Sequence, residues 1–212
     1  MNTDLLRLAG EVHALRDRLR NASNRTPSGS PKALDLSRFG LMSMGLIGVC
    51  YSLAKAQALP SSTAALKLIL GAGDAVLEDL CAGRQPSEQA QADWFAGYWL
   101  NDAELRLYAV FEQLLRTALG VYDYTPVHKL VQRCSDTIMA GPDRDQFTSA
   151  AQRLMHLGVK VNSWKHDPYP SVDTEPRDHR TLDAVASFEA LTLLFGVLLQ
   201  HGPWGSGNEG AA

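Results

Sequence analysis

Apolar side chains recur at helical spacing along most of the chain, and they are densest between Pro86 and Gly120. Ser87 precedes this run as a helix N-cap, and Gly120 follows it as a stop signal. The apolar positions cover more than one stripe of such a helix, which indicates burial on most sides with other helices around it. The pattern predicts one long central helix.

The remaining segments repeat the same period of three to four residues, and none alternates with period two long enough to be a strand. We therefore expect an all-α fold, a helical bundle of about six core helices with an extra N-terminal helix. The predicted organisation is an N-terminal amphipathic helix (1–23), a linker (24–33), the bundle (34–201) and a flexible tail (202–212). Further helices are predicted at about 3–22, 34–58, 61–81, 125–139, from 143 to before Pro168, and from Thr181 to 201, with a proline-rich loop at 167–179.

Leu5, Leu8, Val12, Leu15 and Leu19 alternate three and four apart in the first helix, which is the spacing of a coiled-coil seam. In that register Glu11 and Arg16 would attract each other across a parallel dimer. The alternative is a helix that lays this stripe on its own domain. We expect a homodimer or a constitutive protein complex, because this stripe and the very apolar last helix offer much hydrophobic surface.

Composition places the chain among globular proteins, with 45% hydrophobic and 20% charged residues. A formal net charge of −3 argues against broad electrostatic binding to nucleic acid, although it leaves room for a local basic pocket. The three cysteines are isolated, so we expect reduced thiols and a cytoplasmic protein. The N-terminus is charged throughout and does not resemble a signal peptide.

One run without charges, from Phe39 to Ala54, tests whether the chain enters a membrane. It is shorter than the roughly 20 apolar residues of a spanning helix, and it contains glycines and hydroxyl residues. A buried core helix is the better interpretation, and no membrane partner is expected.

Common signatures of catalysis are absent from the sequence, including a phosphate loop, a dinucleotide fingerprint, a nucleophile elbow and a zinc helix. No two histidines stand at the spacing of helical metal ligands. We therefore predict no metal and no cofactor.

His166 lies at the end of a predicted helix, in a stretch that also carries Lys160, Asn162 and Lys165. Two cations, an amide donor and an imidazole together suit a phosphodiester, because the cations neutralise phosphate and histidine moves a proton near neutral pH. The alternative is structural, since Lys and His at a helix C-terminus complement the helix dipole.

Arg106 and Asp102 form a second candidate set in the central helix. They stand four apart, so the simplest interpretation is an ion pair within the helix. The functional interpretation is a polar seam, with Asn101 and Glu112 on the neighbouring face, that borders a cleft.

The segment from Trp94 to Leu115 resembles the long helix of HEPN-domain proteins, in which a Tyr, an Asn pair, an Arg and a Glu precede a leucine run. The later segment that ends at His166 lies where that family carries an Arg, a polar residue and, four to six residues on, a His. Here Lys160 stands in place of the arginine.

The resemblance implies a helical bundle that usually dimerises and often acts as a metal-independent ribonuclease in bacterial defence, antiviral or toxin–antitoxin modules. It assigns catalysis to His166, Asn162 and Lys160, and substrate binding to Lys165 and Arg106. The function expected from it is RNA cleavage or RNA binding. The alternative from another class is a non-enzymatic helical adaptor that oligomerises and binds a protein partner, and binding of a small molecule in the bundle core is a third.

Overall fold

The computed structural model describes residues 3–58, 66–121, 123–138, 141–166 and 177–201. These residues form seven helices and no strand, which confirms the predicted all-α bundle. The helices are α1 (Thr3–Arg25), α2 (Pro31–Ala58), α3 (Leu66–Cys81), α4 (Glu88–Leu119), α5 (Val127–Thr137), α6 (Pro142–His166) and α7 (Arg177–His201).

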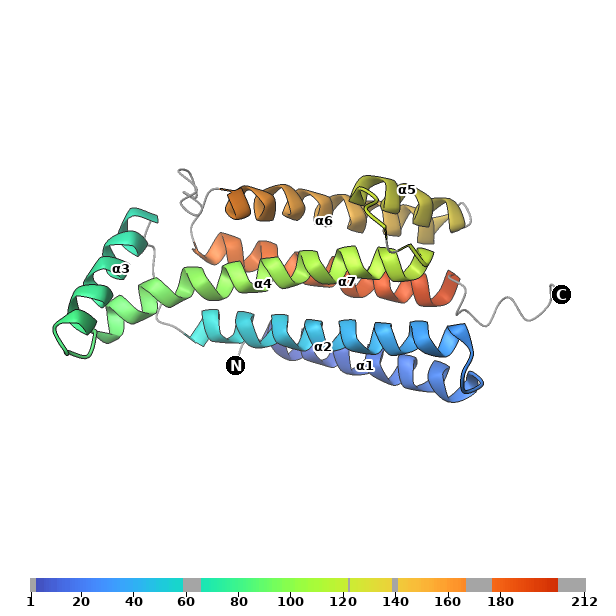
Figure 1. Cartoon of the computed structure of the whole chain (residues 1–212), viewed down its shortest axis with the longest axis horizontal. Helices are drawn as coiled ribbons and strands as arrows, with labels where there is room; N and C mark the ends of the chain where they lie inside the picture. Colours follow the sequence, from blue (N-terminus) through green and yellow to red (C-terminus); the bar gives the residue numbers. More distant parts are fainter. Residues whose placement is uncertain (1–2, 59–65, 122, 139–140, 167–176, 202–212) are drawn as a thin grey trace.

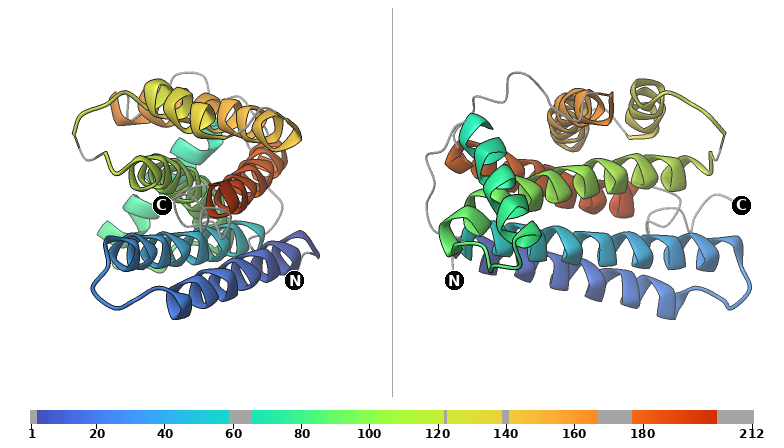
Figure 2. Two further views of the ribbon diagram at one scale, coloured as in Figure 1. Left: turned by 90° about the vertical axis from the view of Figure 1, so that its right-hand side faces the viewer. Right: turned by 60° about the vertical axis from the view of Figure 1, so that its left-hand side comes forward.

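The bundle has three layers, with α1 and α2 on one side, α4 and α7 in the middle, and α5 and α6 on the other side (Figures 1 and 2). α4 contacts α2, α3, α5, α6 and α7, as expected for a helix that is apolar around most of its circumference. α3 and the first turns of α4 project beyond the end of the layers (Figure 1). α4 therefore carries a residue of each ion pair, and one wall of the groove, that are described below.

Both ends of α4 have the predicted chemistry. The Ser87 hydroxyl accepts a hydrogen bond from the Ala90 backbone N–H at 3.1 Å. Gly120 adopts a left-handed conformation, with φ 62°, and its N–H bonds the last turn of the helix. Glycine suits this position because a Cβ would disfavour a positive φ.

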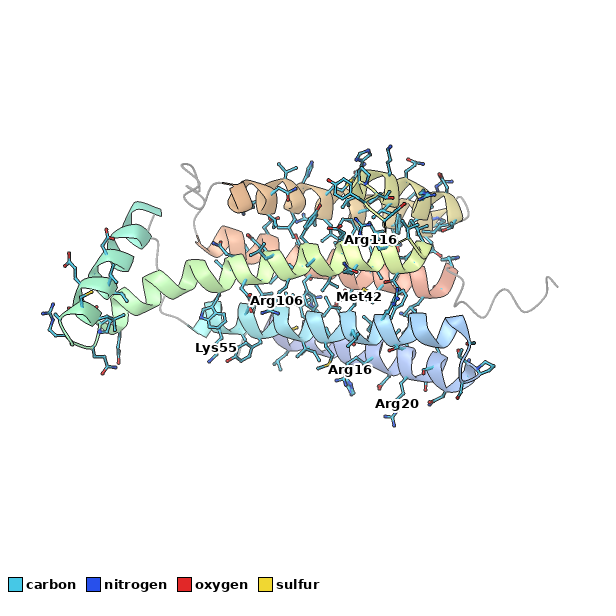
Figure 3. All side chains as sticks on the ribbon, viewed as in Figure 1. Arg16, Arg20, Met42, Lys55, Arg106 and Arg116 are labelled. Atoms are coloured by element: carbon cyan, nitrogen blue, oxygen red, sulfur yellow. The ribbon has the colours of Figure 1, made fainter. Side chains whose placement is uncertain are left out.

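Arg116 fixes the turn that follows α4 (Figure 3). Its guanidinium pairs with Glu112 at 2.7 Å and donates to the backbone oxygens of Asp123 and Thr125, at 2.5 and 3.1 Å. These bonds satisfy two backbone carbonyl groups between α4 and α5.

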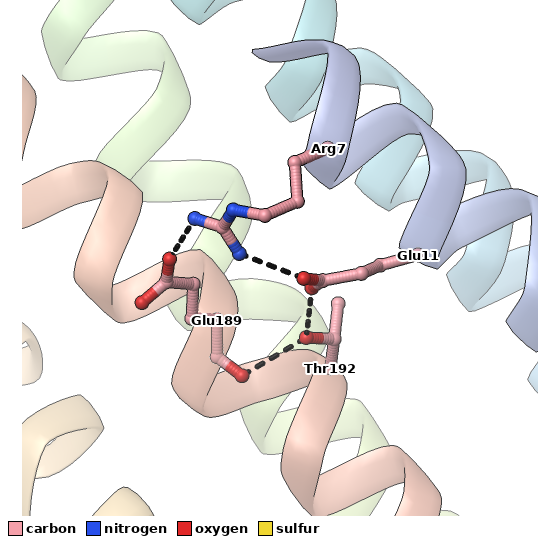
Figure 4. Close-up of polar contacts among 4 residues, drawn as sticks. All are labelled: Arg7, Glu11, Glu189 and Thr192. Carbon is pink, nitrogen blue, oxygen red and sulfur yellow. Dashed lines mark hydrogen bonds and ion pairs between the residues drawn. The ribbon is translucent and has the colours of Figure 1, made fainter. Parts of the chain in front are cut away.

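α1 packs on its own chain. The side chains of Leu8, Val12, Leu15 and Leu19 are at most 5% exposed, and α1 contacts both α2 and α7. A polar cluster supports this contact: Arg7 bonds Glu11 at 2.7 Å and also Glu189, while the Thr192 hydroxyl donates to Glu11 at 3.1 Å (Figure 4). For these four residues the structure confirms the alternative interpretation, in which the heptad stripe lies on its own domain, while the side chain of Leu5 lies outside the described residues.

Helix ends differ from the predictions by a few residues. α2 begins at Pro31 rather than at 34, since proline is well accommodated in a first helical turn. α7 begins at Arg177 rather than at Thr181, so the loop predicted for 167–179 is shorter. The start of the third helix, most of that loop and the tail from 202 lie outside the described residues.

Candidate functional site

The predicted phosphodiester site belongs to the last turns of α6, which runs antiparallel to α4 (Figure 1). Lys160 and Asn162 stand two residues apart on this helix, so their side chains leave it in directions about 200° apart. Lys160 is half-buried and faces α4, whereas Asn162 is exposed. The structure therefore does not bring these two predicted site residues together.

The Lys160 ammonium lies 3.4 Å from the carboxylate of Glu104 on α4. Glu104 is fully buried, with 0% of its surface exposed. A buried carboxylate needs compensating charge, because its removal from water costs several kcal/mol, and Lys160 supplies that charge. The cation that sequence analysis assigned to phosphate thus pairs with a carboxylate of the same chain.

His166 and Lys165 were predicted as the base and a phosphate ligand. They are the last two residues of α6, but their side chains lie outside the described part of the structure. By helix register, position 166 stands one turn beyond the exposed Asn162. The catalytic roles of His166, Asn162 and Lys160 therefore stay predictions.

Arg106 lies on the opposite side of α4 from Glu104 and faces α2 (Figure 3). Its Nε donates to the Asp102 carboxylate at 2.8 Å, which confirms the predicted ion pair within the helix. The Ser52 hydroxyl of α2 donates to the same carboxylate oxygen at 2.6 Å. Burial alone would raise the pKa of Asp102, but the hydrogen bonds from Arg106 and Ser52 bring it below its usual value. Arg106 and Lys160 thus serve two separate contacts of α4.

Tyr108 packs against Gly158 at the crossing of α4 and α6, where an added Cβ would overlap the phenol ring. Burial, followed by the charge of Glu112, raises the pKa of Tyr108, so its phenol stays protonated at neutral pH. Within the described ranges no group of three His, Cys, Asp or Glu side chains is placed to hold a metal ion.

A second surface was not found by sequence reasoning. The side of α2 that faces away from α1 and α7 exposes four large apolar side chains, and the exposed fractions reach 71%. They are Leu41 (71%), Met44 (55%), Ile47 (36%) and Tyr51 (56%), and we call them the α2 outer face.

A groove runs beside this face, between α2 and α4, with a volume of about 490 Å³. Its walls are mostly apolar, and Arg38 and Gln113 supply polar groups. At the far end of the outer face Tyr51 packs edge-to-face on Trp99, with ring centres 6.1 Å apart, and the Lys55 ammonium lies 5.3 Å from the Tyr51 ring (Figure 3). The apolar groove lining comprises Leu41, Met42, Gly45, Ala109 and Val110.

The sequence held a signal for this surface. α2 has apolar residues on both faces: one packs into the core through Phe39, Leu46 and Leu53, which are each 0% exposed, and the other is the outer face. A helix that is apolar all round is expected to be covered all round, so the uncharged run from Phe39 to Ala54 indicated a second contact.

Two helices of the described part are long and apolar enough to cross a membrane, within Leu36–Ala56 and Thr181–His201. Less than half of the first segment and more than half of the second is buried inside the bundle. Core helices of bundles share this length and composition, so these properties alone do not define a span.

Comparisons with protein-family models, with curated proteins and with solved structures find no match to this chain.

Proposed function

We propose that this protein is a non-enzymatic helical adaptor that binds a helix of a protein partner on its α2–α4 side. The α2 outer face carries the proposal, because it combines four exposed apolar side chains with an adjacent groove. Contiguous exposed apolar surface of this kind commonly marks a site of protein association.

The shape of the surface favours a helix as the bound element. The outer face follows one helix, and the groove beside it lies between two antiparallel helices. An amphipathic helix laid into such a groove buries its apolar stripe along the length of the contact. The polar groups at the rim, Arg38 and Gln113, suit the polar edge of a bound helix.

The charged residues near the centre of the molecule support the same proposal. Lys160 lies beside Glu104, and Arg106 is bonded to Asp102, so both cations already interact with carboxylates of this chain. A phosphate group would have to compete with these carboxylates for either cation.

RNA cleavage by a HEPN-like protein of a bacterial defence or toxin–antitoxin module is the second candidate. The observation in its favour is the exposed Asn162, one helical turn before position 166. A base at that position, with an amide donor beside it, would suit attack by a ribose 2′-hydroxyl.

Photo-crosslinking separates the two candidates. A benzophenone amino acid replaces Met44, which is 55% exposed on the outer face, and in a matched control it replaces Leu6, which is 52% exposed on α1. Irradiation of cells that express each variant should give a discrete protein adduct at position 44 and none at position 6.

The RNA assay completes the test. The purified protein is incubated with single-stranded and structured RNA, and the His166→Ala variant is its control. Adaptor function predicts no difference between the two proteins. Cleavage that His166→Ala abolishes without a change in melting temperature would establish the ribonuclease and overturn the adaptor, as would the absence of any adduct at position 44.

A further inference from the structure

We infer that the partner helix on the outer face is acidic, with an apolar stripe that packs on the exposed side chains of α2 and with Asp or Glu residues along its edges. The inference rests on the proposed function, because it gives the chemistry of the partner for the same surface. The distribution of charge supports it: the layer that presents the outer face is basic, although the chain as a whole is acidic.

Basic residues are concentrated in the layer formed by α1 and α2. Residues 1–58 contain eight basic and four acidic residues, whereas residues 59–212 contain twelve basic and nineteen acidic ones. The formal charge of this layer is therefore +4, and that of the rest of the chain is −7. The layer forms one side of the bundle (Figure 1). A surface with such an excess of positive charge attracts acidic partners and repels basic ones.

The outer face lies between basic residues at both of its ends. Arg38 precedes Leu41 on α2, Lys55 follows Tyr51, and no acidic residue occurs from 36 to 58. Arg38 lines the groove, and the Lys55 ammonium lies beside the Tyr51 ring. The two cations stand 17 residues apart on one helix, about 25 Å. A helix of about five turns that lies along α2 therefore reaches both cations with acidic residues on its edges.

The α4 side of the surface adds no net negative charge. Asp102 is an acid that α4 places beside α2, and its carboxylate accepts hydrogen bonds from Arg106 and Ser52. The Arg106 guanidinium lies over Gly48, where an added Cβ would be 3.5 Å from Nη1. An acidic helix on this surface thus meets a neutral ion pair near the middle and cations at the two ends.

α1 extends the basic surface. Arg16 and Arg20 are exposed, and Figure 3 shows them projecting from α1 on the side away from the middle layer. Exposed charges act over about 8 Å at physiological ionic strength and farther at lower salt. These arginines therefore steer an acidic partner toward the layer, which raises the rate of association.

The same charges disfavour other occupants of the surface. A second copy of the chain would bring an equally basic layer to the contact. A helix with basic edges would meet Arg38 and Lys55 as like charges. An anionic membrane has the right sign of charge, but a flat bilayer leaves the groove between α2 and α4 unfilled, whereas a helix fits into it.

Binding of two designed peptides tests the sign of the partner's charge. Both are helices of about 20 residues with the same stripe of leucines, and one carries Glu and the other Lys along its edges. Fluorescence anisotropy of the labelled peptides should show that the full chain binds the Glu peptide about tenfold more tightly. The net charge of −3 alone would favour the Lys peptide, so a preference for Glu reports the local surface. The preference should shrink in about 0.5 M salt.

Paired variants locate the binding site. Arg38→Gln/Lys55→Gln should lower the affinity for the Glu peptide about tenfold. Lys129→Gln/Arg133→Gln is the matched control, because it removes one lysine and one arginine from exposed positions of α5, and it should keep the preference.

A second pair of variants tests the apolar contact. Leu41→Ser should weaken binding of both peptides, whereas Val159→Ser, on α6, should weaken neither, although both residues are 71% exposed. Thermal unfolding of every variant shows whether its fold is intact.

The outcomes distinguish this inference from the proposed function. A preference for the Lys peptide, an equal loss in the α2 and α5 double variants, or no binding of either peptide at about 1 mM overturns the acidic partner. A protein adduct at position 44 then leaves the adaptor standing, and its absence overturns both. Flotation with vesicles of phosphatidylcholine and phosphatidylglycerol that Leu41→Ser abolishes would identify a membrane-binding face and overturn both as well.

Discussion

Lys160 illustrates what a sequence leaves open at the scale of one residue. Its neighbours Asn162 and His166 made a phosphate site reasonable, and the helix that carries them was predictable from its period. The direction of the lysine was not, because it depends on Glu104, 56 positions earlier in the chain and buried on another helix. In the sequence, Glu104 is one of several polar residues that interrupt an apolar run, and no local pattern marks it as the partner of Lys160. Pairings between distant residues have no local pattern, whereas the bond between Arg106 and Asp102 has one and was predicted.

Replacement of Lys160 by Met should destabilise the fold by about 3–5 kcal/mol, because the buried Glu104 loses the nearby ammonium. Adding Glu104→Gln to Lys160→Met should restore much of the loss. Urea denaturation at pH 7 measures both, and Lys129→Met, at an exposed lysine of α5, is the control. An equal cost for Lys160→Met and Lys129→Met would mean that the pair contributes nothing.

Asp102 predicts a pH dependence. Its pKa in the folded protein lies below its usual value, so its contribution is complete above about pH 4 and is lost as the pH falls through the folded pKa. Ser52→Ala removes one of the bonds that stabilise the carboxylate and should cost about 1 kcal/mol at pH 7. The difference from the unsubstituted protein should shrink as the pH falls through the folded pKa, because the carboxylate then takes up its proton. Urea denaturation at a series of falling pH values checks this, and a gap that stays constant down to the acid unfolding of the protein would contradict it.

At the scale of elements, the ends of α4 were predictable because Ser87 and Gly120 cap the helix through bonds and backbone angles within a few residues of themselves. α1 had two interpretations, since the same apolar stripe serves a coiled coil or a contact within one domain, and the choice depends on α2 and α7. α2 was read as a core helix, although only one of its faces is buried. Periodicity identifies apolar faces, but it does not say which helix covers each one.

Two glycines of α2 give a matched test of its packing on α4. A Cβ added at Gly45 would lie 2.7 Å from the Val110 methyl group, whereas one added at Gly40 meets nothing within 4 Å. Gly45→Ala should therefore cost about 1–3 kcal/mol through overpacking. Gly40→Ala should stabilise by up to about 1 kcal/mol, because alanine favours a helix interior. Thermal unfolding measures both, and equal effects would show that α2 and α4 are farther apart.

For the whole molecule, the fold class followed from the uniform helical period and the lack of alternating segments. The layer order did not follow, because the seven helices of the described part can stack in several ways. The position of α7 between α1 and α6 requires contacts between residues far apart in the chain. The candidate surface shares this limit: its residues are visible in the sequence, but their exposure is a property of the assembled bundle.

The packing of α1 on its own chain gives a prediction at this scale. Leu15→Ala should destabilise the protein by about 2–5 kcal/mol, because Leu15 is only 4% exposed in the core. Leu6→Ala, at a leucine that is 52% exposed on the same helix, should change stability by less than about 0.5 kcal/mol. Both are measured by chemical denaturation of the full chain under the same conditions. Similar small effects would mean that α1 is not part of the core.

The middle layer also affects how the protein is made. α7 follows the other six helices in the chain, yet it contacts α1, α2, α4 and α6. While a ribosome is still adding the 25 residues of α7, the surfaces of the other helices that α7 will contact remain exposed. At 5–20 residues per second this interval lasts on the order of 1–5 s, long enough for a chaperone to bind the nascent chain. The bundle therefore closes only after α7 has emerged, and translation speed near the codons of this helix should affect the yield of folded protein.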